Sequence, residues 1–99
     1  MAAELEVLDA AADEAREAAR WYAERNPLAA AAFELEVRHA FHEITETPDS
    51  WPTHVEGTRR FLLHRFPYEI VYRLLGASVL VLAVAHCKRR PGYWRERAV

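Results

Sequence analysis

The residues of this chain that could carry out chemistry gather around His86, at the end of its last apolar run. A histidine titrates near neutrality and can exchange protons, while arginine and lysine side chains can stabilise a charged phosphorane. The cations that could act together with it are Arg65, Arg73, Lys88 and Arg89. These residue types would suit RNA cleavage without a metal, which needs a proton acceptor, a proton donor and cations on the phosphate. We favour a simpler interpretation, in which His86 ends a strand and hydrogen-bonds to a loop while the arginines bind an acidic polypeptide.

Two other groups of reactive residues are better explained by structure than by chemistry. The first group has the spacing of metal ligands on a helix and consists of His39, His42, Glu43 and Glu46. These side chains lie opposite the apolar stripe of the same helix, so we expect a solvent-exposed face, no metal and no cofactor. The second candidate is Cys87. Because adjacent strand residues point to opposite faces, His86 is poorly placed to activate the thiol, and we expect a packing role.

The elements that position these residues begin with three apolar runs of strand length, at residues 61–66, 68–75 and 79–86. Pro67 separates the first two runs, and Gly76, Ala77 and Ser78 separate the last two. Connectors this short predict neighbouring antiparallel strands. The last run is apolar on both faces, which is typical of a central strand that is covered on both sides.

The first half of the chain predicts one short strand and two helices. Residues 3–8 alternate as an edge strand, and helical spacing of apolar residues follows at about residues 9–25 and 28–46, with Asp9 as the expected N-cap of the first helix. Asn26 and Pro27 interrupt the two helices, which predicts an antiparallel hairpin. The fold class is therefore α+β, in the order β-α-α-β-β-β, with the helical hairpin on one face of a small, mainly antiparallel sheet. Residues 1–99 are expected to form a single domain.

A helical hairpin can cover only one face of this sheet. The other face must be covered by the C-terminal tail, with Tyr93 and Trp94, or by a partner chain. We expect an apolar, arginine-rimmed face that is open to a second polypeptide, which would lay a helix or a strand along it.

Charge is divided unevenly between the two halves of the chain. The net charge is −2, but residues 1–50 carry −8 and residues 51–99 carry +6. The modest overall charge argues against non-specific binding of nucleic acid. A single cysteine and an acidic N-terminus without a basic and apolar leader favour a cytoplasmic protein, and no apolar run is long enough to span a membrane.

Several short motifs, together with this order of elements, resemble the RelE/ParE superfamily of toxins from type II toxin–antitoxin systems. These motifs are Arg60-Phe61, Phe66-Pro67-Tyr68, Ile70-Val71-Tyr72-Arg73, Val84-Ala85-His86 and Pro91-Gly92-Tyr93-Trp94. The resemblance covers nearly the whole chain. It implies a toxin that a cognate antitoxin neutralises by wrapping around it.

The resemblance leaves the cellular target open between two classes. RelE-like members cut mRNA on the ribosome, whereas ParE-like members, also described as plasmid stabilisation proteins, inhibit DNA gyrase. Glu69 stands where RelE-like members usually carry an arginine, and the chain is less basic than ribosome-binding members, so the ParE-like class is preferred. A third possibility is a non-toxic adaptor that retains the fold.

Site residues follow from each of these functions. The expected antitoxin contacts are Arg65, Arg73, Lys88, Arg89, Tyr93 and Trp94. In the nuclease alternative, the catalytic residues would be Arg73, His86, Lys88, Arg89 and Tyr93.

Overall fold

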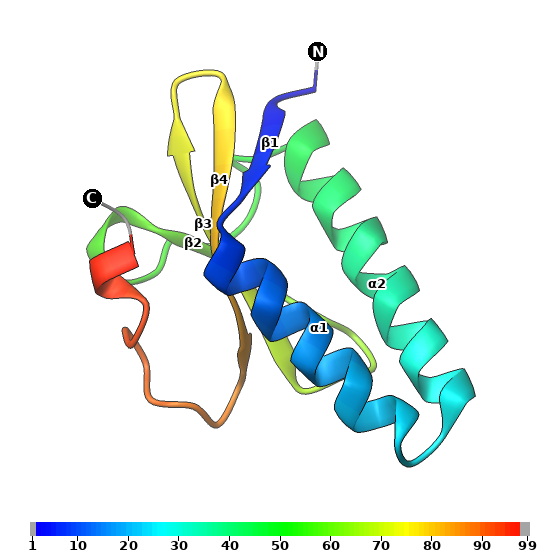
Figure 1. Cartoon of the computed structure of the whole chain (residues 1–99). Coiled ribbons are helices and arrows are strands. Elements are labelled where there is room, and N and C mark those ends of the chain that lie inside the picture. The colour runs from blue at the N-terminus through cyan, green and yellow to red at the C-terminus, as the bar shows by residue number, and fades with distance from the viewer. Residues whose placement is uncertain (1, 98–99) are drawn as a thin grey trace.

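The computed structural model describes residues 2–97 and has the expected order of elements (Figure 1). The strands and helices are β1 (Glu4–Val7), α1 (Asp9–Ala23), α2 (Pro27–Glu46), β2 (Arg59–Leu62), β3 (Tyr68–Leu75) and β4 (Ser78–His86). Two short 3₁₀ helices, Val55–Gly57 and Arg95–Arg97, lie in the loop before β2 and in the tail. Within residues 2–97, no helix is long and apolar enough to cross a membrane.

The four strands form one sheet in the order β1-β4-β3-β2. β4 pairs in parallel with β1 and antiparallel with β3, which pairs antiparallel with β2. The mainly antiparallel sheet and the central position of the last apolar run are therefore confirmed. The strand predicted at residues 61–66 is β2, which begins earlier, at Arg59, and already ends at Leu62. The residues after Leu62 belong to the turn that contains Pro67.

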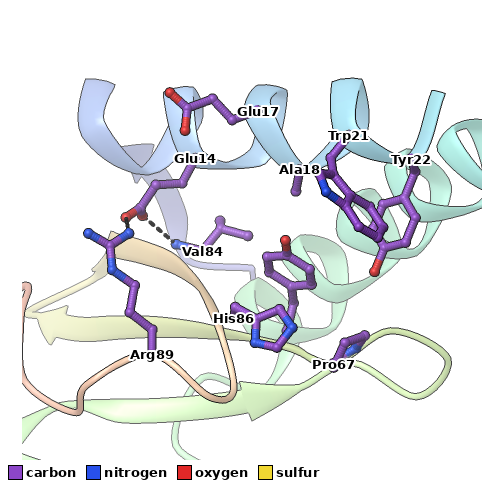
Figure 2. A pocket seen from close by; sticks show the side chains of 10 residues that line it. Glu14, Glu17, Ala18, Trp21, Tyr22, Pro67, Val84, His86 and Arg89 are labelled. Atoms are coloured by element: carbon purple, nitrogen blue, oxygen red, sulfur yellow. Dashed lines mark hydrogen bonds and ion pairs between the residues drawn. The ribbon is translucent and has the colours of Figure 1, made fainter. Parts of the chain in front are cut away.

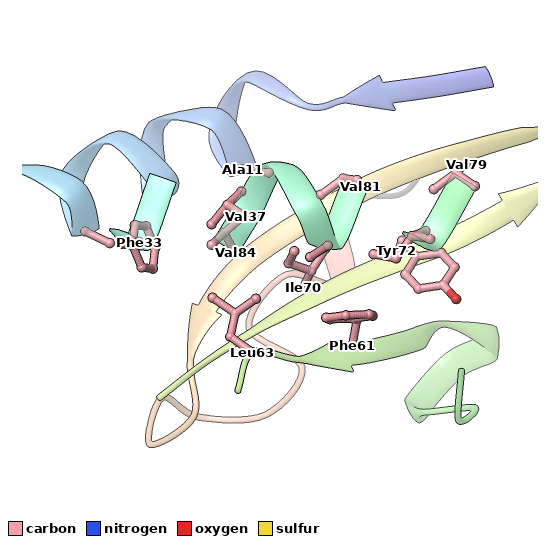
Figure 3. Packing of buried hydrophobic residues seen from close by; sticks show 13 residues of the cluster. Ala11, Phe33, Val37, Phe61, Leu63, Ile70, Tyr72, Val79, Val81 and Val84 are labelled. Atoms are coloured by element: carbon pink, nitrogen blue, oxygen red, sulfur yellow. The ribbon is translucent and has the colours of Figure 1, made fainter. Parts of the chain in front are cut away.

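The helical hairpin covers one face of the sheet. Asn26 is the N-cap of α2, and its side chain accepts a hydrogen bond from the Leu28 amide, with Pro27 in the first turn. The N-cap of α1 is Leu8, without a side-chain bond, so the prediction of Asp9 in that role is wrong; Asp9 lies in the first turn, near the positive end of the helix dipole. Figure 3 shows the core beneath the hairpin, which includes Phe33 and Val37.

The C-terminal tail covers the other face of the sheet, and the expectation of an open apolar face is therefore wrong. Figure 1 shows the tail and the helical hairpin on opposite sides of the sheet. Trp94 is only 1% exposed and packs with Val71 and Leu82, with Val55 from the loop alongside. The tail can turn back because Gly92 has a φ of 81°, a left-handed conformation that suits glycine. An indole placed on this face excludes water from it without a second chain.

A β-bulge in β4 decides which side chains face the helices. Val71 pairs with Ala83 and Tyr72 pairs with Val81, so Leu82 is an extra residue on β4. Leu82 and Ala83 consequently both lie in the tail-side cluster, whereas Val81 and Val84 lie in the helix-side cluster. His86, two residues beyond Val84, is brought to the helix side of the sheet.

Candidate functional site

Glu14 on α1 is the centre of the polar contacts that hold the tail. Its carboxylate accepts hydrogen bonds from the Tyr93 hydroxyl at 2.6 Å and from both terminal nitrogens of Arg97 at 2.9 and 3.1 Å. Arg89 approaches the same carboxylate at 3.4 Å, and its guanidinium lies 3.7 Å from the centre of the Tyr93 ring. We call Glu14, Arg89, Tyr93 and Arg97 the Glu14 network. It joins the first helix to the last residues that the structure describes.

The Glu14 network also completes the edge of β4. β1 pairs only with Ser78–Val81, so the following residues of β4 have no strand on that side. Glu14 accepts a hydrogen bond from the Val84 amide at 3.0 Å, and Arg97 donates one to the Leu82 carbonyl at 3.0 Å. Two side chains thus satisfy backbone groups where a neighbouring strand would otherwise be needed.

The contacts with Glu14 keep the Tyr93 phenol and the Arg97 guanidinium protonated. Burial raises the pKa of Tyr93, and the hydrogen bond to Glu14 raises it further because the phenol must keep its proton to donate. The hydrogen bond to Glu14 raises the pKa of Arg97. At neutral pH neither residue can act as a proton acceptor, so the geometry supports a structural role.

His86 lies in a groove of about 590 Å³ between α1 and the free edge of β4, which we call the α1–β4 groove (Figure 2). α1 contributes Trp21 and Tyr22 to its wall. The His86 ring is 5.1 Å from the ring of Tyr68, and its Nδ1 accepts a hydrogen bond from the Lys88 amide at 3.1 Å. The expected hydrogen bond between His86 and the following loop is therefore present.

The structure separates the residues that the nuclease alternative requires. Arg73 lies on the tail side of the sheet, where it donates a hydrogen bond to the Glu56 carbonyl at 2.9 Å. His86 lies on the helix side and pairs with Tyr68, five residues before Arg73 along β3. Five residues of strand correspond to roughly 17 Å. His86 and Arg89 line the same groove, but Arg73 does not join them.

The expected antitoxin contacts differ in how accessible they are. Lys88 and Arg89 are exposed, and Arg65 is exposed while it pairs with Glu36 at 3.4 Å. Tyr93 is half-buried within the Glu14 network, and Trp94 is buried in the tail-side core. Trp94 cannot contact a partner while the tail stays in this position.

The remaining candidate residues, on α2 and after β4, are exposed to solvent. The helix face with metal-ligand spacing is exposed, as predicted; it comprises His39, His42, Glu43 and Glu46.

Cys87 is exposed as well, so its predicted packing role is wrong: it follows β4 directly, where the chain leaves the sheet. Partial burial raises the pKa of the Cys87 thiol, and the nearby Glu69 carboxylate adds to this rise. A thiol with a raised pKa is a poor nucleophile at neutral pH.

Sequence reasoning missed Glu14 and Arg97. Glu14 did give a signal, because it lies three residues after Ala11 and four before Ala18, both of which are buried on the inner face of α1. An acid in an apolar stripe needs a partner inside the protein. Arg97 gave no comparable signal, since its partners come from residues far away in the chain.

Comparisons with known proteins agree with this fold. A solved structure described as "Chromosomal ParDE TA system from P. aeruginosa" matches with a TM-score of 0.76 and 18% sequence identity, covering 85% of this chain and 95% of that chain. A likeness of this degree defines the fold class of two helices on a four-stranded sheet. No curated protein sequence matches the chain significantly.

The family follows from the sequence. Residues 5–91 match the family described as "ParE toxin of type II toxin-antitoxin system, parDE". The chain therefore belongs to the ParE family of type II toxins, as the motifs predicted.

Proposed function

We propose that this toxin, when free, inhibits DNA gyrase, and that a cognate antitoxin holds it inactive. The match of residues 5–91 to the ParE family carries this proposal. The separation of Arg73 from His86 supports it, because a phosphate cannot contact groups on opposite faces of one sheet. A protein that acts by binding needs no such site.

The antitoxin would bind in part through cations that remain exposed. Lys88 and Arg89 follow β4, and Arg65 lies in the turn between β2 and β3. Acidic side chains of a partner could pair with these residues at the rim of an interface, where they would favour association and correct orientation. We expect charge reversal at Arg65 to weaken the complex, and a smaller effect at Arg73, whose guanidinium already bonds to Glu56.

Ribosome-dependent mRNA cleavage is the second candidate. One observation favours it: His86 and Arg89 line the α1–β4 groove together, with Lys88 adjacent. A nuclease of this kind would use His86 for proton transfer and the basic residues for the phosphate.

Controlled expression without the antitoxin tests these functions. We expect growth arrest with a DNA-damage response and intact mRNA, and we expect the purified protein to inhibit supercoiling by gyrase. Codon-phased mRNA ends that disappear in the His86→Ala variant would establish the nuclease instead. Normal growth at high expression would show a non-toxic adaptor.

A further inference from the structure

Positive charge is concentrated at one end of the sheet, where the segment after β4 lies beside the turn between β2 and β3. The Cys87 amide donates a hydrogen bond to the Pro67 carbonyl at 2.8 Å, which holds the two segments together. Four exposed cations come from these two segments, and we call them the basic end: Arg65, Lys88, Arg89 and Arg90.

The acids that share this end are covered, whereas their cationic partners are not. Glu36 pairs with Arg65 at 3.4 Å, and Glu14 approaches Arg89 at 3.4 Å. Both carboxylate side chains are only 12% exposed, compared with 68% for Arg65 and 53% for Arg89. Each acid therefore fixes a guanidinium from the protein side and leaves its other N–H donors available to an outside partner.

The other two cations of the basic end are not neutralised within the protein. Lys88 and Arg90 form no ion pair with any residue in the described part of the chain. The net charge of −2 does not describe this end, because the half that carries −8 forms β1 and the helical hairpin. A local cationic surface attracts anionic partners whatever the charge of the whole chain.

The basic end lacks the apolar surface that a protein partner would need. Interfaces between proteins bury an apolar centre within a polar rim. Within residues 63–67 and 87–91, no large hydrophobic side chain is exposed, since Leu63 is buried and Phe66 packs against the core. Nucleic-acid interfaces are more polar and much more cationic. The composition of this end therefore fits a phosphate backbone.

The same composition favours a duplex over a single strand. Proteins that bind single strands stack the unpaired bases on aromatic side chains. Phe66 is the one Phe, Tyr or Trp residue within these two segments, and its ring packs edge-on against Tyr22 and Phe33. A duplex keeps its bases stacked inside and presents its phosphates outward, so cations alone can bind it.

We propose that the basic end binds the phosphate backbone of duplex DNA. This inference rests on the proposed function, because gyrase holds duplex DNA, and it adds a direct contact between the toxin and that DNA. Acidic side chains of the antitoxin would compete with the phosphates for the same cations. A bound antitoxin would therefore also keep the toxin away from DNA.

The experiment removes the two cations that have no ion pair. The variant carries Lys88→Ala and Arg90→Ala, and the control carries Arg20→Ala and Arg38→Ala, on the helical hairpin. Arg20 and Arg38 are also exposed and without an ion pair in the described residues, so both variants lose the same charge. Fluorescence anisotropy measures the binding of each protein alone to a short labelled DNA duplex at several salt concentrations, and circular dichroism checks that each variant is folded.

We expect the wild type and the control to bind the duplex with the same affinity and the same dependence on salt. Each phosphate contact contributes about −0.9 to the slope of log K against the logarithm of the salt concentration. The variant at Lys88 and Arg90 should therefore have a slope that is smaller in magnitude by about 1.8, and at about 0.1 M salt its affinity should be lower by roughly tenfold or more.

Four outcomes would overturn this contact: no binding of the duplex by the wild type, equal binding by the variant and the control, tighter binding of a labelled single strand, or tighter binding of a labelled polyglutamate peptide. Inhibition of supercoiling by gyrase is measured separately. A wild-type protein that inhibits gyrase without binding the duplex would refute the DNA contact alone. One that binds the duplex without inhibiting gyrase would refute the proposed function alone.

Discussion

Glu14 accepts hydrogen bonds from four residues, although its neighbour one turn further along α1, Glu17, is exposed. Its carboxylate satisfies the Val84 amide and neutralises Arg97, which is itself only 22% exposed. Removing the negative charge would leave that guanidinium with a weaker partner in a partly desolvated position.

We therefore predict that Glu14→Gln lowers the free energy of unfolding by about 1–3 kcal/mol, measured by urea denaturation. Glu17→Gln makes the same change of charge on the same helix and should alter the free energy by less than about 0.5 kcal/mol. Equal effects of the two substitutions would contradict the role assigned to Glu14.

Cys87 gives a second prediction at the scale of the residue. Partial burial raises the pKa of its thiol above the usual value of 9.0, and Glu69 raises it further, while Arg60 opposes the rise. The rate of alkylation by iodoacetamide should therefore rise with pH to a midpoint above that of an ordinary cysteine. Unfolding in urea should bring the midpoint down to the ordinary value, and a native midpoint below it would show an activated thiol.

At the scale of the element, the C-terminal tail acts as the second layer over the sheet. Trp94 fills this layer, and the bulge at Leu82 directs additional apolar surface toward it. The tail and β4 therefore depend on each other, since removing the indole would expose the apolar face of the central strand.

We predict that Trp94→Ala lowers the free energy of unfolding by about 3–5 kcal/mol and increases the binding of a hydrophobic dye. Trp21→Ala is the matched control: Trp21 is 50% exposed, so this substitution should change both measurements little. Unchanged stability in Trp94→Ala would mean that the tail does not cover the sheet in solution.

At the scale of the whole molecule, the four tyrosines report on the integrity of the fold. Burial raises the pKa of Tyr22, Tyr68 and Tyr93 above 10.0, and raises that of Tyr72 to about 12. The Tyr72 hydroxyl also donates a hydrogen bond to the Pro48 carbonyl at 2.5 Å. Above pH 10 the unfolded chain loses its phenolic protons first, so the free energy of unfolding falls as the pH rises from 10 towards 12. Below pH 10 the tyrosines keep their protons in both states, so the free energy of unfolding does not vary with pH on their account.

We predict that phenolate absorbance of the native protein stays low through pH 10 and then rises cooperatively as the protein unfolds. In concentrated urea the same titration should have a midpoint near 10, the value of an ordinary tyrosine. A native titration with a midpoint near 10 would show that the tyrosines are not buried.

The sequence by itself determined the order of the elements, the helical hairpin, the central place of the last strand and the family. Each of these depends on local signals: apolar periodicity, the break at Asn26 and Pro27, and short connectors between strands. The tertiary structure alone decided that the tail covers the sheet and that His86 faces the helices. Both depend on long-range contacts, because Glu14 and Arg97 meet from opposite ends of the chain and one bulge at Leu82 changes the phase of a strand. Side-chain alternation cannot reveal an extra residue, so the sequence could not predict which groups would share a face.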